Sequence, residues 1–151
     1  MFRSALVATL ASWGLQPRFP NPSADYLKTR AEMSAAAHAT ALRAWKKGIR
    51  LVAGTDTDDG RLPSFTVSSE IAELVKIGIP SMEAVKAATS RAADLLGLAS
   101  RTGSIKPGYE ADLLVIDGNP LADIAALKDV VLVINDGQIA INKLARPLAV
   151  N

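Results

Sequence analysis

One carboxylate stands where α/β proteins commonly place their chemistry. Asp56 follows the short apolar run at 49–53, separated from it only by Gly54 and Thr55. If that run is a buried parallel strand, Asp56 lies at the carboxyl end of a sheet, the end at which barrels and doubly wound folds bind ligands. A carboxylate there can bind a metal ion or move a proton. It can equally cap the loop that follows, so both interpretations stay open.

The other candidate residues show weaker patterns. His38, the single histidine, falls on the apolar side of a predicted helix. That position is typical of a packed histidine rather than a ligand, because catalytic zinc takes about three converging protein ligands. The acidic segment 56–60 does not match a calcium-binding loop, since its fifth position is Gly60. Asp112, at the start of an apolar run, is predicted to make a structural hydrogen bond to a neighbouring turn.

Composition excludes several classes of protein. The 151 residues contain no cysteine, so disulfide scaffolds and thiolate metal sites are excluded. The net charge of +2 is too small for a nucleic-acid footprint, and no apolar run approaches the roughly 20 residues that span a bilayer. Residues 1–12 allow two interpretations, a weak signal peptide or a buried strand. We expect the strand, and a cytoplasmic protein.

The first half of the chain has the pattern of a strand–helix–strand unit. Strands are predicted at 5–10 and 49–53, and the helix between them at about 24–47, ending at Gly48. The helix carries an apolar stripe at steps of three or four residues, formed by Leu27, Ala31, Ala35, His38, Leu42 and Trp45. Such a unit implies parallel strands joined by a right-handed crossover.

The second half changes from helices to strands near residues 98–103. A helix capped by Ser68 or Ser69 is predicted to reach Ile77, and another, capped by Ser81, to run toward Ser90. Residues 91–96 either continue that helix or form a third one. Strands follow at 111–116, 130–134 and 138–141, the last two joined by a predicted Asp136-Gly137 hairpin turn.

Taken in order, these segments resemble a known family. The segment Val52-Ala53-Gly54-Thr55-Asp56 resembles the last barrel strand of the metal-dependent amidohydrolase superfamily, in its imidazolonepropionase-like branch. Further segments match that family in the same order, at 70–75, 78–84, 87–89, 92–97, 103–108, 111–115 and 133–138. The last of these resembles the closing hairpin of the family's small β-domain.

The resemblance implies an α/β fold, with the last two βα units of a TIM-like (β/α)8 barrel followed by part of a small β-sandwich. It divides the chain into residues 1–98, the C-terminal part of the barrel, and 99–151, strands of the appended β-domain. It also implies that Asp56 follows barrel strand eight, binds one catalytic divalent metal, expected to be zinc, and acts as general base toward the water that the metal activates.

The family's other ligands lie earlier in the barrel, after strands one, four, five and six, whereas residues 5–10 resemble strand seven. We therefore expect the C-terminal portion of a hydrolase that cleaves the C–N bond of an amide, a cyclic amide or a dipeptide-like substrate. Such a chain would need the missing N-terminal barrel portion, in cis or in trans, and would self-associate through open strand edges. One subunit of a split enzyme and a non-catalytic binding or structural module are the alternatives.

Overall fold

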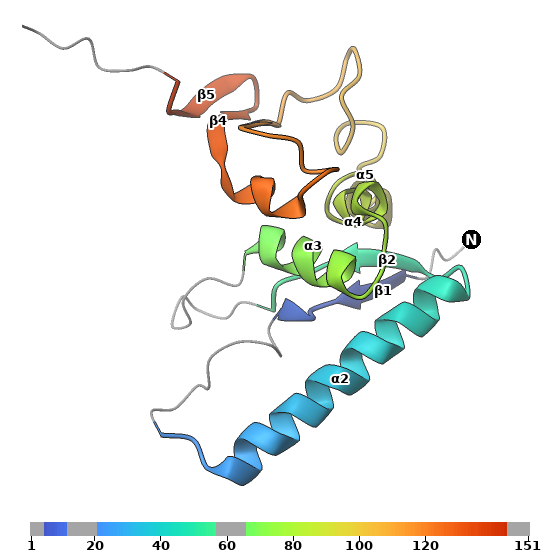
Figure 1. Cartoon of the computed structure of the whole chain (residues 1–151). Coiled ribbons are helices and arrows are strands. Elements are labelled where there is room, and N and C mark those ends of the chain that lie inside the picture. Colours follow the sequence, from blue (N-terminus) through green and yellow to red (C-terminus); the bar gives the residue numbers. More distant parts are fainter. Residues whose placement is uncertain (1–4, 12–20, 57–65, 145–151) are drawn as a thin grey trace, which may run out of the picture.

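The computed structural model, in which residues 5–11, 21–56 and 66–144 are described, begins with a strand–helix–strand unit (Figure 1). Strand β1 (Ala5–Ala8) pairs in parallel with β2 (Arg50–Ala53), and helix α2 (Ala24–Lys46) connects them. The predicted unit is confirmed. Both strands are shorter than expected because the parallel ladder comprises only the pairs from Ala5–Arg50 to Ala8–Ala53.

Helix α2 is much longer than the strands beside it. Its 23 residues span about 35 Å, whereas four strand residues span about 13 Å. The first half of the helix therefore extends past the sheet (Figure 1), and only Ala41 and Ala44 near its end are buried. The predicted stripe is wrong for the first half, because Leu27, Ala31 and Ala35 are exposed there.

Three helices follow β2, namely α3 (Val67–Lys76), α4 (Ser81–Ala88) and α5 (Ser90–Leu95). The predicted caps are wrong. Thr66 caps α3, its hydroxyl accepting the Ser69 N–H at 3.2 Å, and Ser68 and Ser69 lie within the helix. Pro80 precedes α4 with an extended backbone and its carbonyl accepts two amides of the first turn, so Ser81 is already helical.

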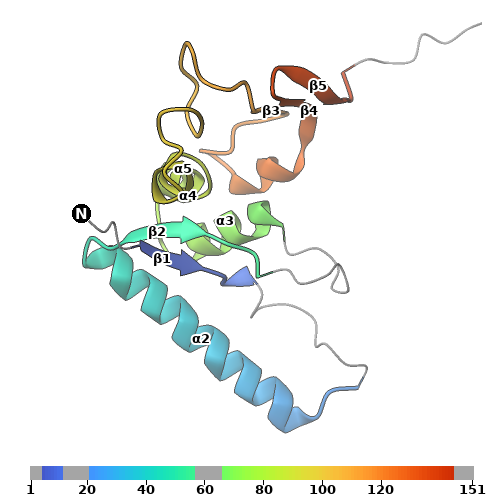
Figure 2. The same cartoon turned by 180° about the vertical axis from the view of Figure 1, so that it is seen from behind.

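The core lies on one face of the β1–β2 sheet. Ala8 and Leu51 of the strands join a buried cluster that also contains Ala41 of α2, Leu74 of α3 and Ala84 of α4. On the opposite face of β1, Val7 is 51% exposed. In both views, α3, α4 and α5 lie between this sheet and the C-terminal strands (Figures 1 and 2). Helix α2 lies on the other side of the two strands from α3, α4 and α5 in these views.

The C-terminal part is an antiparallel sheet with strand order β3–β4–β5. Its strands are β3 (Leu113–Ile116), β4 (Val130–Asn135) and β5 (Gln138–Asn142). The hairpin turn between β4 and β5 is confirmed, since Asp136 and Gly137 both have positive φ, +49° and +74°. A short 3₁₀ helix, η1 (Ile124–Lys128), was not predicted.

The two sheets differ in how well they are covered. Helix η1 places Ile124 and Leu127 against the core of the first sheet. Apolar side chains of the C-terminal sheet, by contrast, are exposed, at Leu114, Val115, Ile139 and Ile141. No helix within the described ranges is long and apolar enough to cross a membrane.

Candidate functional site

Both parallel strands end at the same edge of their sheet. The Gly54 N–H donates to the Ala8 carbonyl at 2.8 Å, which continues the contact one step beyond the ladder. Gly54 has a steric reason to be glycine, because a Cβ there would lie 2.7 Å from a Val7 methyl group. The segment that leads to Asp56 is thus held closely against the end of β1.

Asp56 is exposed and follows β2 by three residues, at the carboxyl edge where it was predicted. Its backbone is left-handed, with φ of +51°, a conformation that Asp and Asn tolerate better than most residues. Unusual backbone conformations of this kind gather at functional sites. The catalytic and metal-binding roles of Asp56 stay predictions.

Glu70, in the first turns of α3, is a fully buried acid that the sequence reasoning did not single out. Its exposed fraction is 0%, and its Oε2 accepts the Ala11 N–H at 2.8 Å. Oε1 has no hydrogen-bond partner in the part of the chain that is described. Burial raises the pKa of Glu70, and the nearby Glu73 adds to the rise, while the amides of Ala11 and Leu10 and the His38 side chain oppose it.

A sequence signal for this burial exists. Glu70 precedes the buried Leu74 by four residues and Ile71 by one, so it lies on the apolar side of α3. Acids are rarely buried, so an acid on the apolar face of a helix is a signal that could have identified Glu70 as a residue with a specific role.

His38 joins α2 to α3, as expected for a histidine packed in a groove between helices. Its Nε2 lies 2.8 Å from Oε2 of Glu73, and its Nδ1 lies 2.7 Å from the Ser34 carbonyl oxygen. Glu73 also forms an ion pair with Lys76 at 3.2 Å. The Ser34 hydroxyl also lies 3.3 Å from Nδ1, so both ring nitrogens have polar partners. His38 is thus a structural clamp.

Ion pairs connect the strands and helices at the opposite, amino edge of the sheet. Arg50 at the start of β2 pairs with Asp94 of α5, and Arg91 of α5 pairs with Glu83 of α4. Glu83 is also within 2.8 Å of Lys86. The Lys86 and Arg91 side chains hold the pKa of Glu83 below its usual value.

Other predicted residues are placed as follows. The structural hydrogen bond predicted for Asp112 is confirmed. Its Oδ1 accepts the Asp136 N–H at 2.9 Å, in the turn of the β4–β5 hairpin. The segment 57–60 of the rejected calcium loop lies outside the described residues.

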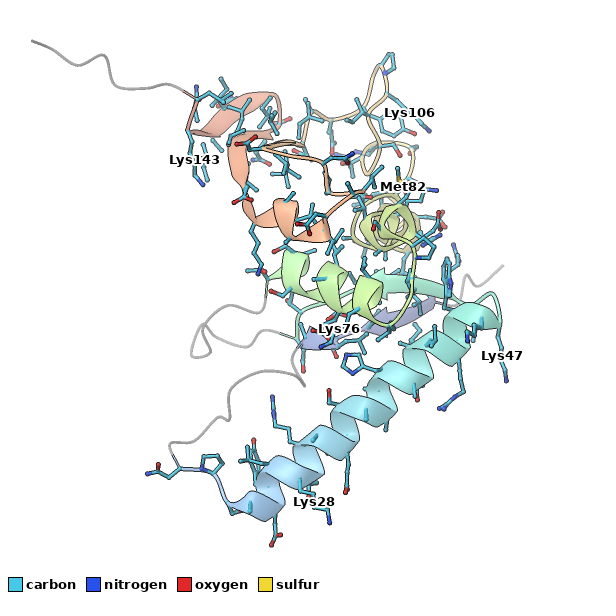
Figure 3. All side chains as sticks on the ribbon, viewed as in Figure 1. Lys28, Lys47, Lys76, Met82, Lys106 and Lys143 are labelled. Atoms are coloured by element: carbon cyan, nitrogen blue, oxygen red, sulfur yellow. The ribbon has the colours of Figure 1, made fainter. Side chains whose placement is uncertain are left out.

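Figure 3 shows Lys28 and Lys47 at opposite ends of α2 and Lys106 and Lys143 on separate parts of the molecule, so these charges form no common patch.

A catalytic metal site needs about three protein ligands that converge on the ion. Within 5–11, 21–56 and 66–144, no group of three or more His, Cys, Asp or Glu side chains is placed to hold a metal ion. A carboxylate oxygen such as those of Asp56 is a suitable ligand for zinc, manganese or magnesium. Asp56 fits a divalent metal as one ligand of several.

Comparisons with known proteins agree with this geometry. The model of the amidohydrolase family matches residues 18–140. Ochratoxinase of Aspergillus niger is 34% identical over 85 residues, which is 56% of this chain and 17% of the ochratoxinase. A candidate prolidase from Bifidobacterium longum superposes with a TM-score of 0.80 and 31% identity, over 97% of this chain and 37% of the prolidase. A Xaa-Pro dipeptidase with methionine bound superposes with a TM-score of 0.68 and 32% identity, over 75% of this chain and 27% of the dipeptidase.

The chain belongs to the amidohydrolase family. It spans 17% of the length of the ochratoxinase, 27% of the dipeptidase and 37% of the prolidase. The fold is accordingly part of a TIM-type barrel with a small sheet attached. The branch within the family stays a prediction.

Proposed function

We propose that this chain forms the carboxyl-terminal part of a metal-dependent amidohydrolase that cleaves a dipeptide-like or other amide C–N bond. The observation that carries the proposal is Asp56, exposed with a left-handed backbone at the carboxyl edge of two parallel strands. In this proposal β1 and β2 are the last two barrel strands. Residues 1–98 belong to the barrel, and 99–151 belong to the appended β-domain.

Asp56 would hold the metal and move a proton. Asp56 would be one ligand of a divalent metal, expected to be zinc, which would supply an activated water when bound. A carboxylate oxygen of Asp56 would accept a proton of the attacking water and pass it to the departing amine nitrogen. The left-handed backbone conformation sets the direction in which the Asp56 side chain leaves the chain, and a group that transfers a proton must be well positioned.

The remaining ligands would come from outside these 151 residues. Family members use a divalent metal, and the part of the chain that is described offers no cluster of three ligands. Three ligands are the usual minimum for a catalytic zinc. We therefore infer that the isolated chain is a poor catalyst or none, and that it acts when the other barrel strands are supplied in cis or in trans.

The exposed apolar residues support the same proposal. Val7 of β1 and Leu114 and Ile139 of the C-terminal sheet are 51%, 60% and 62% exposed. Surfaces of this kind are normally covered. When no complementary portion is present, we expect the chain to associate with itself through them. A non-catalytic binding module is the alternative, and it predicts a stable monomer that binds no metal.

A hybrid enzyme tests the proposal. These 151 residues replace the matching part of the Bifidobacterium longum candidate prolidase, and hydrolysis of Xaa-Pro dipeptides and of N-acyl amino acids is measured with added zinc. Asp56→Asn should lower kcat on the order of 10²–10⁴-fold, because Asn accepts no proton and still tolerates the left-handed backbone. Asp117→Asn, in the C-terminal part, is the matched control. Full activity of the Asp56→Asn hybrid would overturn the proposed role.

A further inference from the structure

Glu70 is a buried acid for which the proposed reaction has no use. It projects from α3 toward the segment 9–11, which follows β1, and its Oε2 accepts the Ala11 N–H at 2.8 Å. The amide is buried as well, since Ala11 is 4% exposed. Because β1 ends at Ala8, no neighbouring strand in the described sheet receives this amide. Glu70 satisfies a buried donor that would otherwise be costly.

The segment 9–11 lies directly against the residues that lead to Asp56. Leu10 is 3% exposed and belongs to the core cluster, so the segment is packed rather than projecting into solvent. A Thr9 methyl group lies 3.5 Å from where a Cβ of Gly54 would be, and the Gly54 N–H binds the Ala8 carbonyl. The Glu70 side chain thus contacts segment 9–11, and that segment with the end of β1 contacts Gly54, two residues before Asp56.

An apolar residue would be the cheaper occupant of this position. A carboxyl group that is fully removed from water loses its hydration, and here the protein replaces it only in part, because Oε2 accepts the Ala11 N–H and Oε1 has no partner among the described residues. A leucine of similar size would fill the space without that loss, and it would leave the Ala11 amide without an acceptor. The choice of an acid is explained by the need to hold that amide.

We propose that Glu70 is a positioning residue, which fixes segment 9–11 against Gly54 and thereby holds Asp56 at the carboxyl edge of the sheet. The proposal rests on the proposed function for the meaning of Asp56, but the contacts it invokes need neither metal nor substrate. It extends the site from the strand ends to the first turns of α3.

Hydrogen–deuterium exchange resolved to single amides tests this in the 151-residue chain. Glu70→Leu removes the acceptor, whereas Glu70→Gln keeps a carbonyl oxygen at the same place. Glu70→Leu should speed exchange of the Ala11 and Gly54 amides about tenfold, as expected for the loss of one buried hydrogen bond. Glu70→Gln should restore exchange to within about threefold of the unsubstituted chain. Glu73→Leu, on the same helix but bonded to His38, is the matched control and should leave both amides unchanged.

Three results would overturn the proposal. They are unchanged exchange in Glu70→Leu, equally fast exchange in Glu70→Gln, and the same acceleration in Glu73→Leu, which would indicate general destabilisation. If Glu70→Leu does not fold, the unsubstituted chain decides, because its Ala11 amide must exchange far more slowly than an exposed one.

The hybrid enzyme separates this inference from the proposed function. Glu70→Leu should lower kcat with little change in KM, and Glu70→Gln should recover it. If Asp56→Asn keeps full activity while Glu70→Leu still frees the Ala11 and Gly54 amides, the proposed function fails and the structural coupling stands. If the amides do not respond, the coupling fails whatever the activity.

Discussion

The two edges of the β1–β2 sheet treat charge in opposite ways. At the amino edge, Arg50 pairs with Asp94, and Arg91 pairs with Glu83 while its guanidinium lies 5.3 Å from the Trp45 ring centre. At the carboxyl edge, Asp56 is exposed with a left-handed backbone, and Glu70 is buried with one oxygen bound to a backbone amide. The charges at the amino edge are paired with opposite charges, whereas these two acids at the carboxyl edge form no ion pair among the described residues.

The pKa directions of two glutamates show the same difference. Glu70 and Glu83 both lie near the start of a helix, α3 and α4 respectively. Burial raises the pKa of Glu70, and two cations lower the pKa of Glu83. In a (β/α) barrel the amino edge mainly serves stability and the carboxyl edge mainly serves function, and Glu83 and Glu70 lie toward these two edges respectively.

Leu74→Ala, in the core between the two edges, should have the largest effect on stability. Leu74 is 0% exposed, and a buried leucine truncated to alanine costs about 3 kcal/mol of the free energy of unfolding. Denaturant unfolding measures the change. Leu96→Ala, at a position 71% exposed, is the control and should stay within about 0.5 kcal/mol. Equal losses would mean that the core is not where the structure has it.

Arg91→Ala tests the amino edge. It removes the ion pair with Glu83, a 2.9 Å hydrogen bond to the Glu83 carbonyl and the contact with Trp45, at a side chain only 20% exposed. We expect a loss of about 2 kcal/mol in the free energy of unfolding and no change in metal affinity of the hybrid enzyme. Arg101→Ala, whose side chain is 65% exposed, should cost less than about 1 kcal/mol. A drop in metal affinity for Arg91→Ala would break the division between the edges.

A double-mutant cycle tests the clamp between α2 and α3. His38→Gln and Glu73→Gln, singly and together, should give a coupling energy of about 1 kcal/mol, since Nε2 and the carboxylate are 2.8 Å apart and partly buried. Chemical denaturation of the four chains measures it. Additive losses would show that the two side chains do not interact.

The pH dependence of stability should distinguish the two glutamates, with small effects of opposite sign. Glu70 has a raised pKa in the folded chain, so its stabilisation is complete below its unfolded pKa and is lost as pH rises through the folded value. Glu83 has a lowered pKa, so its stabilisation is present above its unfolded pKa and is lost as pH falls. When the free energy of unfolding is measured across pH, Glu70→Gln should reduce the loss of stability toward higher pH, and Glu83→Gln should reduce the loss toward lower pH. A reduced loss at the same end of the pH range in both variants would contradict these directions.

Much of the fold follows from local signals in the sequence. Gly48 and Gly78 follow the ends of α2 and α3 with positive φ, and Asp136-Gly137 forms the predicted hairpin turn. Such signals depend on one or two residues and their immediate neighbours. The burial of a helix also depends on how far the sheet beneath it extends, and the residues of the helix itself do not reveal that length. Leu27 is 46% exposed for that reason.

The candidate site was predicted in the same uneven way. The position of Asp56 at the strand end could be predicted because a strand and a Gly-Thr pair precede it within the same segment. Glu70 was missed because its partner, Ala11, lies 59 residues earlier in the chain, and only the folded packing of segment 9–11 on α3 brings them together. The Thr66 cap was missed because Thr66, Ser68 and Ser69 all offer a hydroxyl, and the start of the helix decides among them.

The most direct test of the account is the zinc affinity of the hybrid enzyme, measured by calorimetry for the unsubstituted protein and for Asp56→Asn. If Asp56 is a metal ligand at the functional edge, the affinity should fall by about tenfold or more while the free energy of unfolding without metal changes by less than about 0.5 kcal/mol. An unchanged zinc affinity in Asp56→Asn would contradict the claim that this edge of the sheet carries the function.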